Sequence, residues 1–165
     1  MHKHTTLNQN NLSFILAQRQ VIKDALQPEI YHRCNLFKTI EGVNYINDCQ
    51  STCPNMLWFA LEITPKPLIL IAGGQYSSTI KLNFLEPYLK PVKTIISLET
   101  KQHLLKTVYG GKIYYAKSIF EAISYAYHLA NKGDNVLCSP GASSFNLFDG
   151  WEDRYHQFNT HINSI

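Results

Sequence analysis

The stretch KIYYAKSIFEAISYAYHLANKGDNVLC, residues 112–138, contains the pattern that decides the fold. Each of its ends is a short apolar run, typical of a strand that helices cover on both faces. Between them, apolar residues recur at helical spacing along one stripe: Ile119, Ala122, Ile123, Ala126 and Ala130. Ser118 with Glu121 predicts a capping box, and Gly133 predicts the stop. Strand, helix and strand in succession predict a right-handed parallel unit.

The same alternation continues on the N-terminal side. Two more apolar runs, residues 68–71 and 94–98, have the character of buried strands. Two β-prone runs, residues 34–40 and 43–47, flank Glu41-Gly42, a two-residue turn of the kind that joins a hairpin. Weaker helix candidates are residues 54–61, 82–89, 101–107 and 146–161. The sequence therefore predicts an α/β fold, Rossmann-like, with a mainly parallel sheet, helices on both faces and an N-terminal β-hairpin.

The first residues form a separate unit in this interpretation. Apolar residues spaced by three and four along residues 12–26 predict an amphipathic helix that Pro28 stops. We expect residues 1–29 to be an N-terminal helix or linker and residues 30–165 to be one compact domain, because a chain of 165 residues has room for one core.

Composition excludes several classes of protein. Hydrophobic residues make up 45% of the chain and charged residues 16%, which argues against disorder. The net charge of +3 is too small to predict a nucleic-acid partner. The chain shows neither a signal peptide nor an apolar run that could span a membrane, so we expect a cytoplasmic protein. Its four cysteines include no C-x-x-C pair and its seven histidines no H-E-x-x-H motif, so we expect no metal site.

Ligands of open α/β sheets gather beyond the carboxyl ends of the strands. The loops at residues 48–53, 72–78 and 139–145 combine small residues with hydroxyls ahead of a helix start, where backbone N–H groups suit an anion. The same residues also serve simply to cap helices and turn the chain. The sequence lacks a G-x-x-x-x-G-K-[ST] phosphate loop, so it predicts no nucleotide-hydrolysing centre of its own.

Taken together and in order, the motifs are more specific than any one of them. They are His32-Arg33, Gly42-Val43-x-x-Ile46-Asn47-Asp48-x-x-x-Thr52, Leu70-Ile71-Ala72-Gly73-Gly74, and Leu137-x-Ser139-Pro140-x-Ala142-x-Ser144-Phe145 followed by Phe148, Glu152, Arg154 and Phe158. This order resembles the C-terminal domain of the Mur ligases, most closely that of the D-glutamate-adding branch. In that comparison residues 1–29 look like a remnant of the helix that ends the central domain.

The resemblance implies roles for named positions. Those that match the amino-acid substrate site are Thr52, Ser144, Phe145 and Trp151. Those that match positions facing the nucleotide are His32, Arg33 and Asp48. The alternatives are purely structural roles: Trp151 belongs to the core, and Arg33 and Asp48 form a salt bridge with each other.

Two family lysines are replaced, one by Gln50 and one by Ser77. A lysine near a transferring phosphoryl group or a substrate carboxylate supplies a full charge, and losing one such contact typically costs about 100-fold in rate. Gln50 and Ser77 donate hydrogen bonds but cannot neutralise a carboxylate. We therefore expect D-glutamate or a related small anion to bind weakly.

The resemblance implies the amino-acid-binding domain of an ATP-dependent, amide-forming ligase of peptidoglycan precursor synthesis. ATP and Mg would act only in a complete ligase, with the N-terminal and central domains supplied in cis or in trans, and the isolated chain is predicted to be inactive. The alternative is a stand-alone domain that has lost catalysis and binds a small ligand or a protein. A generic Rossmann-like nucleotide-binding domain explains the strands but not the string from Ser139 to Arg154.

Overall fold

The structure is a computed structural model that describes residues 33–77, 79–99, 103–143 and 147–165. The helix predicted at residues 12–26 lies outside the described residues.

The described residues form a six-stranded sheet in the order β1-β2-β6-β3-β4-β5. β1 and β2 pair antiparallel, and every other neighbouring pair is parallel. Glu41 and Gly42 make the hairpin turn with φ of 51° and 80°, a left-handed pair of values that matches the twist of the flanking strands. The strands are β1 (Asn35–Ile40), β2 (Val43–Asn47), β3 (Leu68–Ala72), β4 (Thr94–Ser97), β5 (Ile113–Tyr115) and β6 (Asn135–Cys138).

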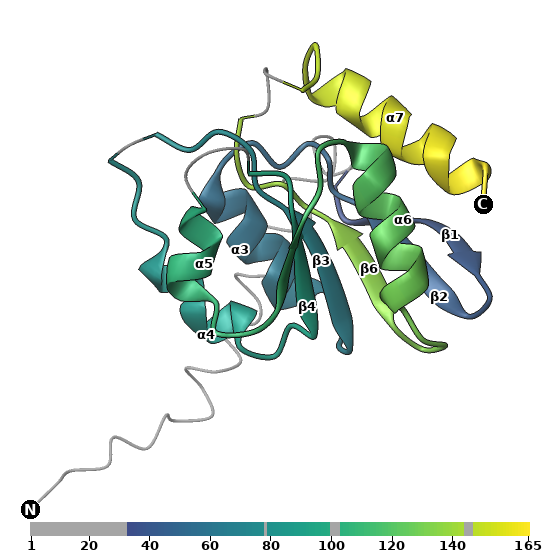
Figure 1. Cartoon of the computed structure of the whole chain (residues 1–165), viewed down its shortest axis with the longest axis horizontal. Coiled ribbons are helices and arrows are strands. Elements are labelled where there is room, and N and C mark those ends of the chain that lie inside the picture. Colours follow the sequence, from purple (N-terminus) through teal and green to yellow (C-terminus); the bar gives the residue numbers. More distant parts are fainter. Residues whose placement is uncertain (1–32, 78, 100–102, 144–146) are drawn as a thin grey trace, which may run out of the picture. The chain divides into compact units, whose positions relative to one another are not determined.

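Helices cover both faces of this sheet (Figure 1). One layer contains α3 (Pro54–Ile63), η1 (Asn83–Leu85), α4 (Glu86–Leu89) and α5 (Leu104–Val108), and the other contains α6 (Ile119–Leu129) and α7 (Trp151–Asn163). Within β3, Leu68 and Leu70 pack toward the first layer while Ile69 and Ile71 pack toward the second. All four are fully buried, and each contributes about 1.5–3 kcal/mol, which explains the unbroken apolar run.

The predicted fold class is confirmed, and so is the capped helix: the Ser118 side chain accepts from Glu121 N at 3.2 Å at the start of α6. Two helix predictions need correction. The one at residues 82–89 is instead a 3₁₀ turn followed by the four-residue α4. The one at residues 146–161 begins only at Trp151, because Gly150 has φ 146° and breaks the helical backbone just before it.

Candidate functional site at the carboxyl edge of the sheet

Three loops meet at the carboxyl edge, the upper end of the sheet in Figure 1. Asp48 N, after β2, donates to Cys138 O at 2.8 Å. Gly73 N, after β3, donates to Pro140 O at 2.8 Å, and Gly141 N, after β6, donates to Ser51 O at 3.1 Å. The loops that the sequence singled out are therefore joined by their backbones into one surface.

Asp48 is a heavily bonded side chain of this edge. Its carboxylate is fully buried and accepts from Ser139 Oγ at 2.6 Å, from Cys34 N at 3.3 Å and from the Arg33 guanidinium. Arg33 also donates to Met56 O at 3.1 Å, and its side chain is only 12% exposed. Both carboxylate oxygens of Asp48 therefore accept hydrogen bonds within the protein. This is the arrangement expected if Arg33 and Asp48 form a salt bridge with each other. A contact of either residue with a nucleotide stays a prediction.

Arg154 organises the same edge, although sequence reasoning gave it no role. It is 1% exposed and donates to the carbonyls of Cys49 at 2.9 Å, Ser51 at 3.2 Å and Ala142 at 3.5 Å. Burial lowers the pKa of its guanidinium. Arg154 therefore holds the loop after β2 against the loop after β6. The available signal was its position, since it lies four residues before Phe158 on the buried stripe of α7.

Two polar side-chain atoms near Arg154 have no hydrogen-bond partner among the described residues. Within the described part of the chain, Gln50 Oε1 and Ser51 Oγ are buried and make no hydrogen bond. Ser51 is fully buried, whereas Gln50 is half-buried. Thr52 is exposed next to them, and its hydroxyl lies 3.8 Å from Met56 Sδ. The predicted substrate residue Thr52 and the replaced lysine position Gln50 thus lie on one loop, ahead of α3.

Ser77, the second position at which a family lysine is replaced, lies on the loop after β3. Ser77 is exposed, and its Oγ lies 3.1 Å from Thr79 Oγ1. Gln75 N donates to Ser143 O at 2.6 Å, which fixes this loop to the one after β6. Gly74 makes that approach possible, because a Cβ there would lie 2.4 Å from Ser143 O.

Glu99, just after β4, is a second buried acid that sequence reasoning missed. It is 4% exposed, and its carboxylate accepts from Ser97 Oγ at 3.2 Å and from Leu105 N at 3.3 Å. Burial raises the pKa of the Glu99 carboxyl, and the hydrogen bonds oppose that shift. Its side chain packs under Gly73, where an added Cβ would lie 2.9 Å from Glu99 Cγ. The Glu99 side chain therefore packs against the loop after β3 at Gly73.

The remaining predicted residues are placed only in part. Trp151 is half-buried at the first position of α7. Ser144, Phe145 and His32 lie outside the described residues. Of the four predicted substrate residues, the structure describes Thr52 and Trp151, and the roles of all four stay predictions.

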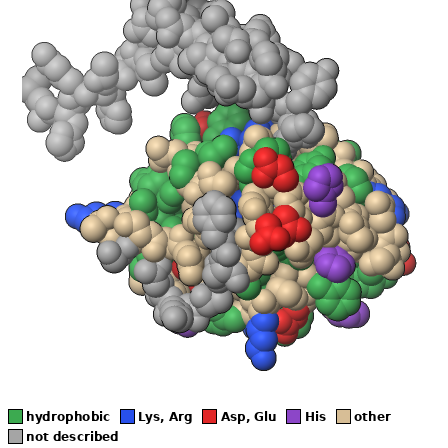
Figure 2. Space-filling view, turned by 90° about the horizontal axis from the view of Figure 1, so that it is seen from above, with side chains coloured by type: hydrophobic (Ala, Val, Ile, Leu, Met, Phe, Trp, Pro, Cys, Tyr) green, Lys and Arg blue, Asp and Glu red, His purple; other side chains and the backbone are tan. Residues whose placement is uncertain are grey.

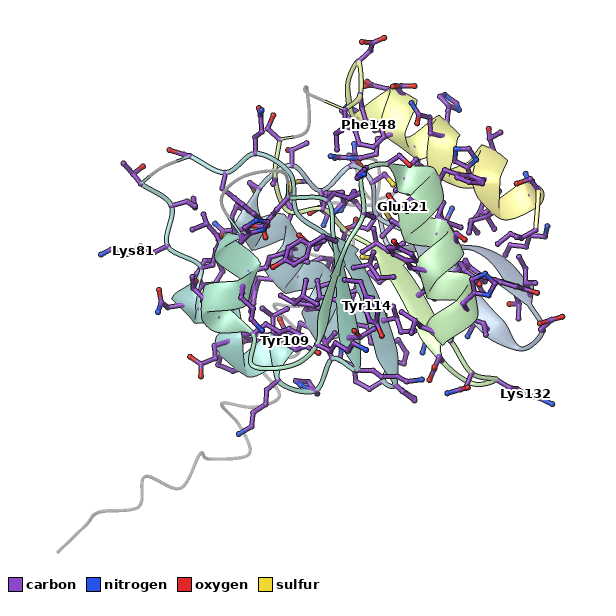
Figure 3. All side chains as sticks on the ribbon, viewed as in Figure 1. Lys81, Tyr109, Tyr114, Glu121, Lys132 and Phe148 are labelled. Atoms are coloured by element: carbon purple, nitrogen blue, oxygen red, sulfur yellow. The ribbon has the colours of Figure 1, made fainter. Side chains whose placement is uncertain are left out.

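Other features of the described residues lie away from this edge. A cavity of about 430 Å³ opens at the amino ends of β4 and β5, beside Tyr109 (Figure 3), and its other lining residues are Glu86, Lys90, Val92, Lys93, Val108, Gly110 and Gly111. The described residues contain no group of three His, Cys, Asp or Glu side chains that could hold a metal ion. None of their helices is both long and apolar enough to cross a membrane.

Two relatives illustrate the sequence similarity. The chain is 37% identical over 150 residues to the UDP-N-acetylmuramoylalanine--D-glutamate ligase of Porphyromonas gingivalis, a match that covers 88% of this chain and 33% of the ligase. It is 36% identical over 143 residues to the ligase of the same name from Chlorobium phaeobacteroides, covering 84% and 31%. The chain thus spans about a third of the length of these curated relatives. No protein-family model matches it.

Solved structures support the fold at low sequence identity. A murein peptide ligase from Psychrobacter arcticus superposes with a TM-score of 0.57 at 14% identity, over 82% of this chain and 30% of that one. A single domain of a ligase from Haemophilus ducreyi gives 0.54 at 9% identity, over 78% of this chain and 98% of that one. The second match covers almost the whole of that separately solved domain, so the described residues share the fold of that one domain.

Proposed function

This chain has the fold and the sequence relationship of a Mur ligase C-terminal domain, and we propose that it presents the incoming amino acid in an amide-forming, ATP-dependent ligation. The observation that carries the proposal is the carboxyl edge itself. There, Arg154 and Asp48 fix the loop after β2 to the loop after β6, backbone bonds from Gly73 and Gln75 attach the loop after β3, and Thr52 and Ser77 are exposed beside them. The acceptor named for the relatives is UDP-N-acetylmuramoylalanine and the amino acid is D-glutamate. Both are proposed for this chain in the context of a complete, cytoplasmic ligase.

The chain's own part in the reaction is to bind and orient. Thr52 and Trp151, together with Ser144 and Phe145, hold the amino acid, and the backbone N–H groups ahead of α3 suit its carboxylate. Holding the amine in place converts a bimolecular attack into a step within one complex. Water has to be excluded from the activated carboxylate, which closing of the domains achieves.

ATP and Mg²⁺ supply the phosphoryl chemistry that activates the acceptor carboxylate. Among the described residues, only those at the border of the carboxyl edge could contact ATP or Mg²⁺. Asp48 has both oxygens engaged, Arg33 is mostly buried, and the described residues contain no cluster of three His, Cys, Asp or Glu side chains that could hold Mg²⁺. We therefore assign the ATP and Mg²⁺ sites mainly to the other ligase domains, in cis or in trans, with Arg33, which Asp48 holds in place, and the preceding His32 as the nucleotide contacts from this side.

A graft tests the proposal. The C-terminal third of the Porphyromonas gingivalis ligase is replaced by residues 30–165, and phosphate release is measured with ATP, Mg²⁺, UDP-N-acetylmuramoylalanine and D-glutamate. We expect turnover roughly 10⁴-fold below the parent ligase, because each of the two missing lysines costs about 100-fold. A ligase truncated before its last domain is the control. A folded graft no more active than the truncated control would refute the proposal.

A second candidate is a stand-alone binding domain that has lost catalysis. Neutral residues at both lysine positions favour it, and the Ser77 hydroxyl is already paired locally with Thr79. This candidate predicts an inactive graft together with ligand binding by the chain alone. The ligase-domain proposal predicts a graft that turns over.

A further inference from the structure

Two cysteine thiols meet at the carboxyl edge, between the loop after β2 and the end of β6. Cys49 Sγ lies 3.3 Å from Cys138 Sγ, and both side chains are fully buried. The two residues are 89 positions apart in the chain. A disulfide bond is about 2.05 Å long, so the two sulfurs would need to approach each other by only about 1.3 Å to form one.

The backbone already holds these two cysteines side by side. β2 and β6 are neighbouring parallel strands, in which Asn47 is paired with Cys138. Asp48 N donates to Cys138 O at 2.8 Å, and Cys49 O accepts from the Arg154 guanidinium at 2.9 Å. Groups that a fold holds next to each other react as if at a very high local concentration. A bond between the two sulfurs therefore requires little further ordering of the chain.

The surroundings of the two thiols favour a small, neutral oxidant. Burial raises the pKa of the Cys49 thiol, and the nearby Arg154 guanidinium opposes that shift. Because the reactive thiolate is scarce and shielded, a bulky reagent reaches it only if the loop opens. Figure 2, which views the molecule from above this edge, shows the visible Lys and Arg side chains scattered, an arrangement that gives an anionic oxidant no advantage. Hydrogen peroxide is uncharged and close to water in size, so it fits both conditions.

We infer that Cys49 and Cys138 are a site of reversible disulfide formation by peroxide, which locks the loop after β2 to the end of β6. Peroxide converts one thiol to a sulfenic acid and releases water. The second thiol then attacks that sulfur, the S–S bond forms and a second water leaves. Two thiols are thus oxidised while one peroxide molecule is reduced to two waters. The bond fastens the loop that carries Thr52, so oxidation acts directly on the candidate site.

Peptide mapping of the full chain tests the inference. The protein is treated with hydrogen peroxide, its remaining free thiols are alkylated in denaturant, and a digest is sequenced by tandem mass spectrometry. We expect peptides cross-linked through Cys49 and Cys138, lighter than the reduced pair by two hydrogen atoms and separated again by dithiothreitol. Cys34 and Cys53 should not be cross-linked, because neither makes a sulfur–sulfur contact among the described residues. Recovery of Cys49 and Cys138 as alkylated thiols, or bonded to other cysteines, would overturn the inference.

Melting temperatures of matched variants show whether the bond acts as a lock. Peroxide treatment should raise the melting temperature of the parent chain and of Cys53→Ala by about 5–15 °C, because a disulfide that closes so long a loop restricts the unfolded chain. Cys49→Ala and Cys138→Ala, measured separately, should show no such rise.

A rise that survives either substitution would overturn the assignment to this pair. An oxidised parent chain that melts no higher than the reduced one would overturn the lock. The proposed function concerns ligation and does not depend on this bond, so either failure leaves the proposed function standing.

Discussion

Ser139 donates a 2.6 Å hydrogen bond to the buried carboxylate of Asp48, a residue that lies 91 positions earlier in the chain. The bond joins the end of β6 to the end of β2, neighbouring strands of the sheet. Because the carboxylate is fully buried, each of its hydrogen bonds replaces lost hydration. This pair fixes the relative position of two of the three loops of the site.

Substituting Ser139→Ala should therefore destabilise the fold. A hydrogen bond to a charged group contributes about 1.5–3 kcal/mol, and we expect a loss of that size in the free energy of unfolding measured with urea. Ser164→Ala is the control, because the Ser164 hydroxyl bonds the His161 carbonyl on an exposed helix end. Equal losses for the two variants would contradict the role assigned to Ser139.

Substituting Arg154→Met should cost more. Three backbone carbonyls lose their charged donor in the protein interior, and we expect roughly 3–5 kcal/mol in urea unfolding. The amide signals of Cys49 to Ser51 should also shift, because the loop is released. Lys132→Met removes the same charge from an exposed side chain (Figure 3) and should change stability by less than about 0.5 kcal/mol.

Substituting Gly74→Ala tests the close contact between two loops. An added Cβ would lie 2.4 Å from Ser143 O, so the loops must separate and the bond from Gln75 N is lost. We expect a cost of about 2–4 kcal/mol, as for other steric conflicts in packed regions. Gly133→Ala provides the comparison, since Gly133 has φ +94° but nothing within 4 Å of the added atom. Thermal unfolding should rank Gly74→Ala as the more damaging change.

The buried Glu99 predicts a pH dependence of stability. Burial raises the pKa of its carboxyl in the folded state above 4.5, so the folded protein holds that proton more tightly than the unfolded chain. The stabilisation is complete below the unfolded pKa and is lost as pH rises through the folded pKa. Glu99→Gln should remove this loss, so its advantage over the parent in urea unfolding should grow as pH rises from about 4. Glu86→Gln, on an exposed residue, should show no such trend.

Restoring both lysines should strengthen the binding of D-glutamate. Gln50→Lys with Ser77→Lys adds two charges at the edge, each contributing about 1–3 kcal/mol through a charge-assisted contact with a carboxylate. D-glutamate should then bind at least about tenfold more tightly than to the parent chain, and more so at low salt. Calorimetric titration at two salt concentrations measures this. Unchanged affinity would show that this edge does not hold the side-chain carboxylate.

The sequence by itself determined the class of fold and which loops lie together at the candidate site. Strands such as Leu68–Ala72 are unbroken apolar runs because both faces of the sheet are covered, and the Ser118 cap and the Glu41-Gly42 turn are local features. Since parallel strands end at the same edge, the loops that follow them could be assigned to one surface from sequence.

Only the tertiary structure decided which groups form hydrogen bonds with each other or pack together at that edge. Ser139 with Asp48, Arg154 with Cys49, and Glu99 with Gly73 are contacts between loops whose residue types are ordinary when each loop is considered alone. The same holds for Gln50, whose side-chain oxygen is seen to be buried without a hydrogen bond only when the surrounding described residues are placed. Hydrogen-bond pairing between distant loops depends on distance and direction in space, and neither composition nor periodicity along the chain encodes those quantities.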